Sequence, residues 1–159
     1  MLRPVGVKTF DDYVKSSILQ YVSTKAKNYE RLHFVFDVYN PNSLKDATRQ
    51  KRGSGIRIKV TPQAPVPTNW HGFLSESSNK TLLFNLIADY LQQVNPYTTD
   101  IFVTKEKVVL TNTAEDVSLL SPCSQEEADT RLLHTSSCAG KCIINSGYRR
   151  CCHLCSSLF

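Results

Sequence analysis

Apolar residues recur at helical spacing in two long stretches of the chain. The first begins at Thr9, a good N-cap, carries Asp11 and Asp12 in its first turn, and runs to about residue 26. The second begins at Asn79, also read as an N-cap, and runs to about residue 94. Both stretches keep their apolar residues on one side, so the pattern predicts two amphipathic helices packed against a core.

Shorter apolar runs predict the strands. Residues 32–36 are almost continuously apolar, which is typical of a strand covered on both faces, as in a parallel sheet. Residues 100–104 and 108–111 are expected to form two further strands on either side of a tight turn at Lys105 and Glu106. Residues 56–60 alternate between apolar and basic, as an edge strand or an extended arm does.

The connections complete an α/β pattern. Residues 61–68 contain three prolines and are expected to form an irregular linker. Trp70 and Phe73 follow it, and we expect them to fix the linker to the core rather than to form an aromatic cage or stack on bases. The order of elements predicts an α/β sandwich, although the parallel strand expected near its end is not apparent in the sequence.

Carboxylates at two distant places could meet in such a fold. Ser124 is a good N-cap, and Glu127 completes a capping-box pattern, so Glu126, Glu127 and Asp129 would lie in a first helical turn. Acids there complement the helix dipole, which is the simpler interpretation. Asp37, however, is expected at the carboxyl end of the strand 32–36, and carboxylates so arranged could bind a divalent metal ion.

A short basic helix is predicted from Ser43 to about residue 51. One side of this helix would carry Lys45, Arg49 and Arg52. These basic residues would form either a solvated surface or a contact with phosphate groups. The chain carries 19 Lys and Arg against 14 Asp and Glu, a net charge of +5 that is compatible with a nucleic-acid partner. At 159 residues, with 41% hydrophobic and 21% charged residues, the composition is that of one globular domain.

The sequence indicates an intracellular protein without a membrane span. No window approaches the length of an apolar membrane helix, and residues 1–7 lack the apolar core of a signal peptide. Five of the six cysteines lie after residue 137, unlike a usual disulfide framework, so a reducing compartment is expected. The glycosylation pattern at Asn79 is therefore interpreted as a helix start.

Several of these motifs together resemble one family. The first matching segment comprises residues 34–39, followed by 43–46 and 49–52. It resembles the "VFDGY…S-x-K-D…R" segment of PIN-like proteins, which are relatives of the flap endonucleases. Residues 127–129, Glu-Ala-Asp, are similar to the paired-acid helix start of that group. The span 8–140 looks like a set of animal PIN-like proteins that often occur in multicopy families, with the motifs in the same order.

The resemblance implies a Rossmann-like, three-layer α/β/α nuclease fold with an incomplete sheet. It implies that Asp37, Glu127 and Asp129 are catalytic ligands of two Mg²⁺ or Mn²⁺ ions, which activate water for phosphodiester hydrolysis. It also implies phosphate contacts from basic residues, namely Lys45, Arg49, Lys51 and Arg52. The non-catalytic alternative is a nucleic-acid-binding or protein-interaction scaffold that keeps the fold and its basic residues.

The two ends of the chain depart from the family pattern. A first strand bearing an acid and a later strand ending in Asp-Thr-Asp are both missing, so residues 1–140 are expected to form a partial PIN-like domain, weakly active or inactive. Residues 141–159 are expected to be a poorly ordered, cysteine-rich tail read out of frame. Shifting the codons after Lys141 by one base permits a strand that ends in Asp-Thr-Asp.

Zinc is the less favoured alternative for the tail. Its four candidate ligands are Cys138, Cys142, Cys151 and Cys155. Their spacing matches no common zinc finger, and the tail could also be without function. Catalytic cysteine chemistry is weaker still, because Cys123 has no histidine base that the sequence places beside it.

Sequencing of the transcript and locus across codons 135 to 159 tests the frame. We expect a single-base difference that restores the Asp-Thr-Asp strand. A reading frame identical to the present one would contradict this expectation, and zinc analysis of the tail would then follow.

Overall fold

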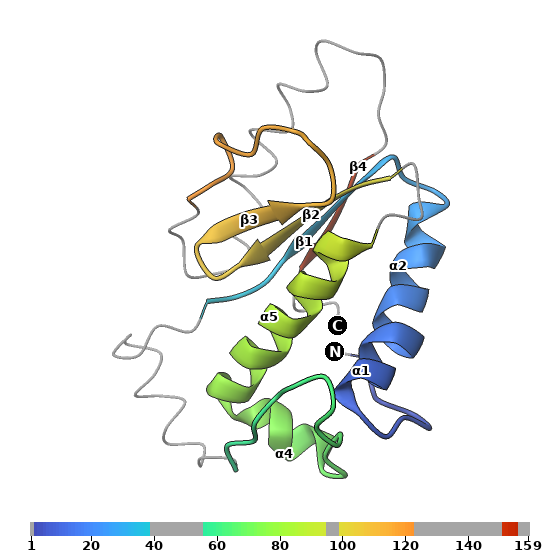
Figure 1. Ribbon diagram of the computed structural model, residues 1–159, viewed down its shortest axis with the longest axis vertical. Coiled ribbons are helices and arrows are strands. Elements are labelled where there is room, and N and C mark those ends of the chain that lie inside the picture. The colour runs from blue at the N-terminus through green and yellow to red at the C-terminus, as the bar shows by residue number, and fades with distance from the viewer. Residues whose placement is uncertain (1, 39–55, 95–98, 123–150, 156–159) are drawn as a thin grey trace.

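The computed structural model describes residues 2–38, 56–94 and 99–122 and the strand Cys151–Cys155 (Figure 1). The predicted first helix forms as three continuous pieces: α1, Phe10–Tyr13; a π-helical turn η1, Val14–Ile18; and α2, Leu19–Ala26. The remaining helices are α4, Trp70–Ser75, and α5, Ser77–Gln93. The strands are β1, Arg31–Val35; β2, Asp100–Lys105; β3, Val108–Thr111; and β4, Cys151–Cys155.

The strands form one mixed sheet in the order β3-β2-β1-β4. β1 pairs in parallel with both β2 and β4, whereas β2 and β3 form an antiparallel hairpin. The connection from β1 to β2 contains α4 and α5, which is the crossover that adjacent parallel strands require. Helices and a mixed sheet in this arrangement confirm the predicted α/β class.

β1 is buried along its whole length, as the continuous apolar run predicts. Leu32 and Phe34 pack with the helices, which gather on one side of the sheet in Figure 1. On the opposite side, Phe102 and Val109 form a smaller cluster with residues of the segment that follows β3, namely Val117 and Leu120. On this second face, the described segment after β3 therefore covers part of the β2–β3 hairpin.

β4 lies within the tail that the sequence analysis expected to be poorly ordered. Its register runs from Arg31 opposite Cys151 to Val35 opposite Cys155. An α/β pattern calls for a parallel strand at this point of the chain, but Cys-Cys-His-Leu-Cys contains none of the Val, Ile, Thr, Phe, Tyr or Trp residues that are typical of strands, so the sequence did not indicate one. The domain boundary at 140 and the shifted frame stay predictions.

The predicted start of the first helix is confirmed by a capping box. Thr9 Oγ1 accepts a hydrogen bond from the Asp12 backbone N–H at 3.1 Å, and Asp12 Oδ2 accepts from the Thr9 N–H at 3.0 Å. The neighbouring Asp11 accepts a hydrogen bond from the Tyr90 hydroxyl, which ties α1 to α5. That bond is the main cause that raises the pKa of Tyr90 to about 12 and lowers the pKa of Asp11.

The linker is anchored through aromatic packing, as expected. Trp70 is 8% exposed and Phe73 is 2% exposed, so both lie in the core and neither offers a free ring face for a ligand. The Trp70 ring lies 5.1 Å from the ring of Tyr13 and 5.0 Å from that of Phe73, centroid to centroid. The contact between Tyr13 and Trp70 joins α4 to α1.

The prediction that Asn79 caps α5 is wrong. Glu76 is the N-cap, and its carboxylate accepts a hydrogen bond from the Ser78 N–H at 3.3 Å. Asn79 is fully buried one turn further on, and its amide makes three hydrogen bonds to backbone groups. It accepts from Ile58 N at 2.9 Å and donates to Ile56 O at 2.9 Å and to Phe73 O at 3.1 Å. A glycan could not attach to this amide in the folded protein.

This amide also explains why residues 56–60 form no strand. The side chains of Ile58 and Val60 pack against the core, which accounts for the alternating pattern. The backbone of Ile56 and Ile58 is satisfied by Asn79 rather than by a neighbouring strand. Of the two interpretations left open by the sequence, the extended arm is confirmed. None of the described helices combines the length and apolar character needed to cross a membrane.

Replacement of Asn79 by alanine is expected to destabilise the fold by about 3 kcal/mol, because one buried and two partly buried backbone groups lose their hydrogen bonds to its amide. Denaturant unfolding measures the change. The matched control is Asn28→Ala at an exposed position, which should change the free energy of unfolding by less than about 0.5 kcal/mol. Equal stability of the two variants would contradict the assigned role of Asn79.

Candidate functional site

Asp37 lies where the sequence analysis predicted, just past the carboxyl end of β1. The last residue of β1 is Val35, and the backbone N–H of Phe36 donates to Thr104 Oγ1 on β2 at 2.8 Å. This bond holds the chain beside β2 for one more residue before Asp37 leaves the sheet. In open α/β sheets, the carboxyl ends of the parallel strands are where ligands bind.

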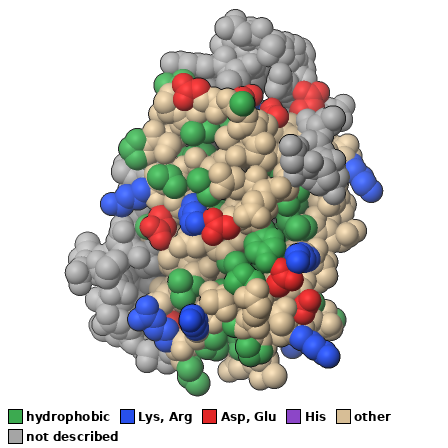
Figure 2. All heavy atoms as spheres, viewed as in Figure 1, with side chains coloured by type: hydrophobic (Ala, Val, Ile, Leu, Met, Phe, Trp, Pro, Cys, Tyr) green, Lys and Arg blue, Asp and Glu red, His purple; other side chains and the backbone are tan. Residues whose placement is uncertain are grey.

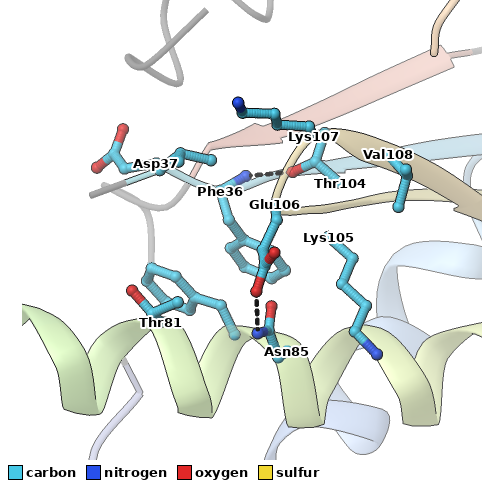
Figure 3. Close-up of a pocket in the computed structure, with 11 residues that line it drawn as sticks. Phe36, Asp37, Thr81, Asn85, Thr104, Lys105, Glu106, Lys107 and Val108 are labelled. Atoms are coloured by element: carbon cyan, nitrogen blue, oxygen red, sulfur yellow. Dashed lines mark hydrogen bonds between the residues drawn. The ribbon is translucent and has the colours of Figure 1, made fainter. Parts of the chain in front are cut away.

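An open cavity of about 340 Å³ adjoins Asp37. Figure 3 shows it between the end of β1, the first half of α5 and the turn that joins β2 to β3. The residues that line it come from these three elements: Phe36, Asp37, Val38, Thr81, Phe84, Asn85, Thr104, Lys105, Glu106, Lys107 and Val108.

One side of the cavity is aromatic and apolar. The rings of Phe36 and Phe84 stack in parallel, with centroids 4.5 Å apart and planes 7° apart. Their residues are only 4% and 6% exposed, so the pair forms a packed floor. Val38 and the half-exposed Val108 extend the apolar lining.

The opposite side is polar and is tied to α5. Glu106 has a positive φ of 53°, which closes the tight turn predicted between the strands. Its carboxylate accepts a hydrogen bond from Asn85 Nδ2 at 3.0 Å. Lys105 forms an ion pair with Asp89, one helical turn further along α5. These two contacts fix the turn against the helix.

Asp37 and Lys107 lie at the rim of the cavity. In Figure 3 the Asp37 carboxylate points away from Asn85 and Glu106, while the Lys107 side chain extends from the turn on the side of the sheet nearer Asp37. Lys107 is exposed and Asp37 is half-buried. Charged groups of both signs therefore border an apolar hollow.

The described residues bring together only part of the predicted site. Six predicted residues lie outside the described ranges: Glu127, Asp129, Lys45, Arg49, Lys51 and Arg52. Cys138 and Cys142 also lie outside them, whereas Cys151 and Cys155 are the ends of β4. Within the described part of the chain, no three His, Cys, Asp or Glu side chains are grouped closely enough to hold a metal ion. The predicted metal and zinc sites stay predictions.

Sequence reasoning missed most of the cavity. Thr81 and Asn85 are separated by four residues and so share one side of α5, a relation that the helical pattern could have revealed. Nothing in the pattern, however, indicates that this side meets the turn at Glu106. Thr104 could not be recognised from the sequence as a hydrogen-bond acceptor for β1 either. The only signal was its position as a polar residue inside an apolar strand.

Basic and acidic side chains are interspersed on the face of the molecule shown in Figure 2. The net positive charge of the chain is thus not gathered into a single patch among the described residues of this face. Comparison of the chain with protein-family models, curated proteins and solved structures finds no match in any of the three.

Replacement of Thr104 by valine is expected to lower the free energy of unfolding by about 1–3 kcal/mol, because the buried Phe36 N–H loses its acceptor. Hydrogen exchange at the Phe36 amide should become faster, which reports the local effect directly. Thr111→Val on β3, where the hydroxyl is less buried, serves as the control and should cost less than about 1 kcal/mol. Unchanged exchange at Phe36 would contradict this role of Thr104.

Proposed function

We propose that this chain is a PIN-like, metal-dependent nuclease-type domain that hydrolyses phosphodiester bonds in nucleic acid with weak activity. The observation that carries the proposal is the position of Asp37. It follows the central parallel strand β1, at the edge of the sheet where α/β proteins bind their ligands, and it borders an open cavity.

The sheet order supports a Rossmann-like arrangement. β1 lies between β2 and β4, so the chain leaves β1 towards one neighbour and later returns to its other side. Strand connections that diverge in this way create a crevice at the carboxyl end of the central strand. The three-layer α/β/α form of the sandwich is part of this proposal.

A divalent metal ion fits the chemistry of the Asp37 side chain. Mg²⁺ takes oxygen ligands and is often held by one or two carboxylates together with substrate phosphates. In the proposed site Asp37 would be one such ligand, and Glu127 and Asp129 would be the others. The ion would lower the pKa of a bound water and neutralise charge on the phosphate. Asp37 itself would orient the ion at the sheet edge.

Replacement of Asp37 by asparagine tests the proposal. Slow Mn²⁺-dependent cleavage of labelled single-stranded and branched oligonucleotides is expected from the unmodified chain. The rate should fall by about 100-fold or more in Asp37→Asn, in line with the loss of groups that hold a catalytic metal. Titration calorimetry should show weaker Mn²⁺ binding in the same variant.

Asp116→Asn is the control, because Asp116 is an exposed acid on the segment after β3 and its removal changes the net charge equally. Cleavage that survives in Asp37→Asn but not in Asp116→Asn would contradict the proposal. Salt-sensitive binding of nucleic acid without any cleavage would instead favour the non-catalytic scaffold.

A further inference from the structure

The net positive charge of the chain lies in one short stretch of its sequence. Residues 45–59 contain six basic residues and one acid, a net charge of +5 that equals the value for the whole chain. The rest of the chain is therefore electrically balanced. Two of the six cations, Arg57 and Lys59, belong to the described arm of residues 56–60. Charge that is concentrated in this way favours an anionic partner.

The backbone of the arm is fixed on both sides of Arg57. Asn79 of α5 accepts a hydrogen bond from the N–H of the residue after Arg57 and donates one to the C=O of the residue before it, each at 2.9 Å. Ile58 and Val60 pack against the core, whereas Arg57 and Lys59 alternate with them and are exposed. Because residues two apart in an extended chain project to the same side, the arm presents two cations about 6.6 Å apart along its length.

Neither cation of the arm is neutralised by a described acid. No ion pair or hydrogen bond joins the side chain of Arg57 or Lys59 to another residue of the described ranges. Lys15 and Lys105, by contrast, each form an ion pair with an aspartate. Within the described part of the chain, both charges of the arm can therefore meet an anionic ligand.

The arm lies at the same end of the molecule as the cavity. Asn79, which holds the arm, comes two residues before Thr81, and Thr81 lines the cavity that Asp37 borders. In Figure 1 the arm begins the teal part of the ribbon and passes beside the N-terminal end of α5. An anionic chain bound along the arm is thus at the end of the sheet where Asp37 lies.

We propose that Arg57 and Lys59 hold successive phosphates of a single nucleic-acid strand. The inference rests on the proposed function and deepens it, because it names residues that would guide the strand towards Asp37. An arginine guanidinium offers a forked set of donors and a lysine ammonium offers a compact charge, and both bind phosphate in proteins. Phosphate contacts carry no sequence information, so the arm should bind strands of any base sequence.

The salt dependence of binding tests the arm. Fluorescence anisotropy measures the affinity of the full chain for a labelled single-stranded oligonucleotide of mixed sequence, in EDTA and over a series of salt concentrations. Each phosphate contact with a single strand contributes about 0.7 to the slope of log affinity against log salt. Arg57→Ala combined with Lys59→Ala should therefore lower the slope by about 1.4. At low salt this double variant should bind about tenfold more weakly, the scale of two ion pairs at a protein surface.

Two further double variants are the matched controls. Lys25→Ala combined with Lys27→Ala removes the same charge from the end of α2 and should leave the slope unchanged. Arg57→Lys combined with Lys59→Arg keeps both charges on the arm and should leave it unchanged as well. Thermal melting of each variant confirms that it is folded.

The outcomes separate this inference from the proposed function. An unchanged slope in the alanine variant of the arm, or an equal loss in the α2 variant, would refute the arm, while Asp37-dependent cleavage would still support the nuclease. A loss of slope confined to the arm variant would support the arm even where no cleavage is detected. A labelled polyglutamate that binds with the same dependence on Arg57 and Lys59 would assign the arm to an acidic peptide and overturn the nucleic-acid assignment.

Discussion

β1 is paired along both edges and buried along its whole length, and apart from His33 at its centre its polar and charged residues lie at or just beyond its ends. Its backbone bonds to β2 on one edge and to β4 on the other, and its five residues are all buried. At its amino end, Arg31 is paired with Glu115 and lies 3.9 Å from Asp100. At its carboxyl end, Asp37 is the first charged residue that the chain can bring to the sheet edge.

The contacts that build the site differ in strength. The ion pair of Lys105 with Asp89 is about a third to a half exposed, and pairs of this kind contribute less than about 1 kcal/mol. The bond from Phe36 N to Thr104 is buried, so its loss would leave an unsatisfied N–H in the core. The register of β1 against β2 is thus held mainly by buried contacts, while the surface contacts only orient the turn.

Periodicity predicted the elements but not how they meet. The sequence predicted the two long helices because the buried side of each leaves a regular apolar pattern. It predicted three strands, at residues 32–36, 100–104 and 108–111, for the same reason. Asn79 was misread because a polar residue before an apolar stripe has the pattern of a cap. Its actual role depends on residues about twenty positions earlier, and such contacts leave no local signal.

In the candidate site, too, local sequence patterns predicted single elements but not the contacts between them. Asp37 could be placed because it follows a buried strand, and a turn at Glu106 could be placed because two strands flank it. Their relation to Thr81 and Asn85 required the packing of α5 on the hairpin, which depends on the side chains of the whole core. β4 could not be predicted at all, because its pairing with β1 satisfies the backbone whatever the side chains are.

The charges around the cavity place a condition on any phosphate that binds there. Asp37 and Glu106 are both carboxylates, so a phosphodiester that approaches this edge of the sheet meets charge of its own sign. Lys107 brings one positive charge to the same rim, and the pairing of Glu106 with Asn85 directs that carboxylate towards the helix. A divalent ion on Asp37 would offset the charge of Asp37 itself. The metal dependence that we propose would therefore follow from one electrostatic requirement, the screening of these carboxylates from the phosphate.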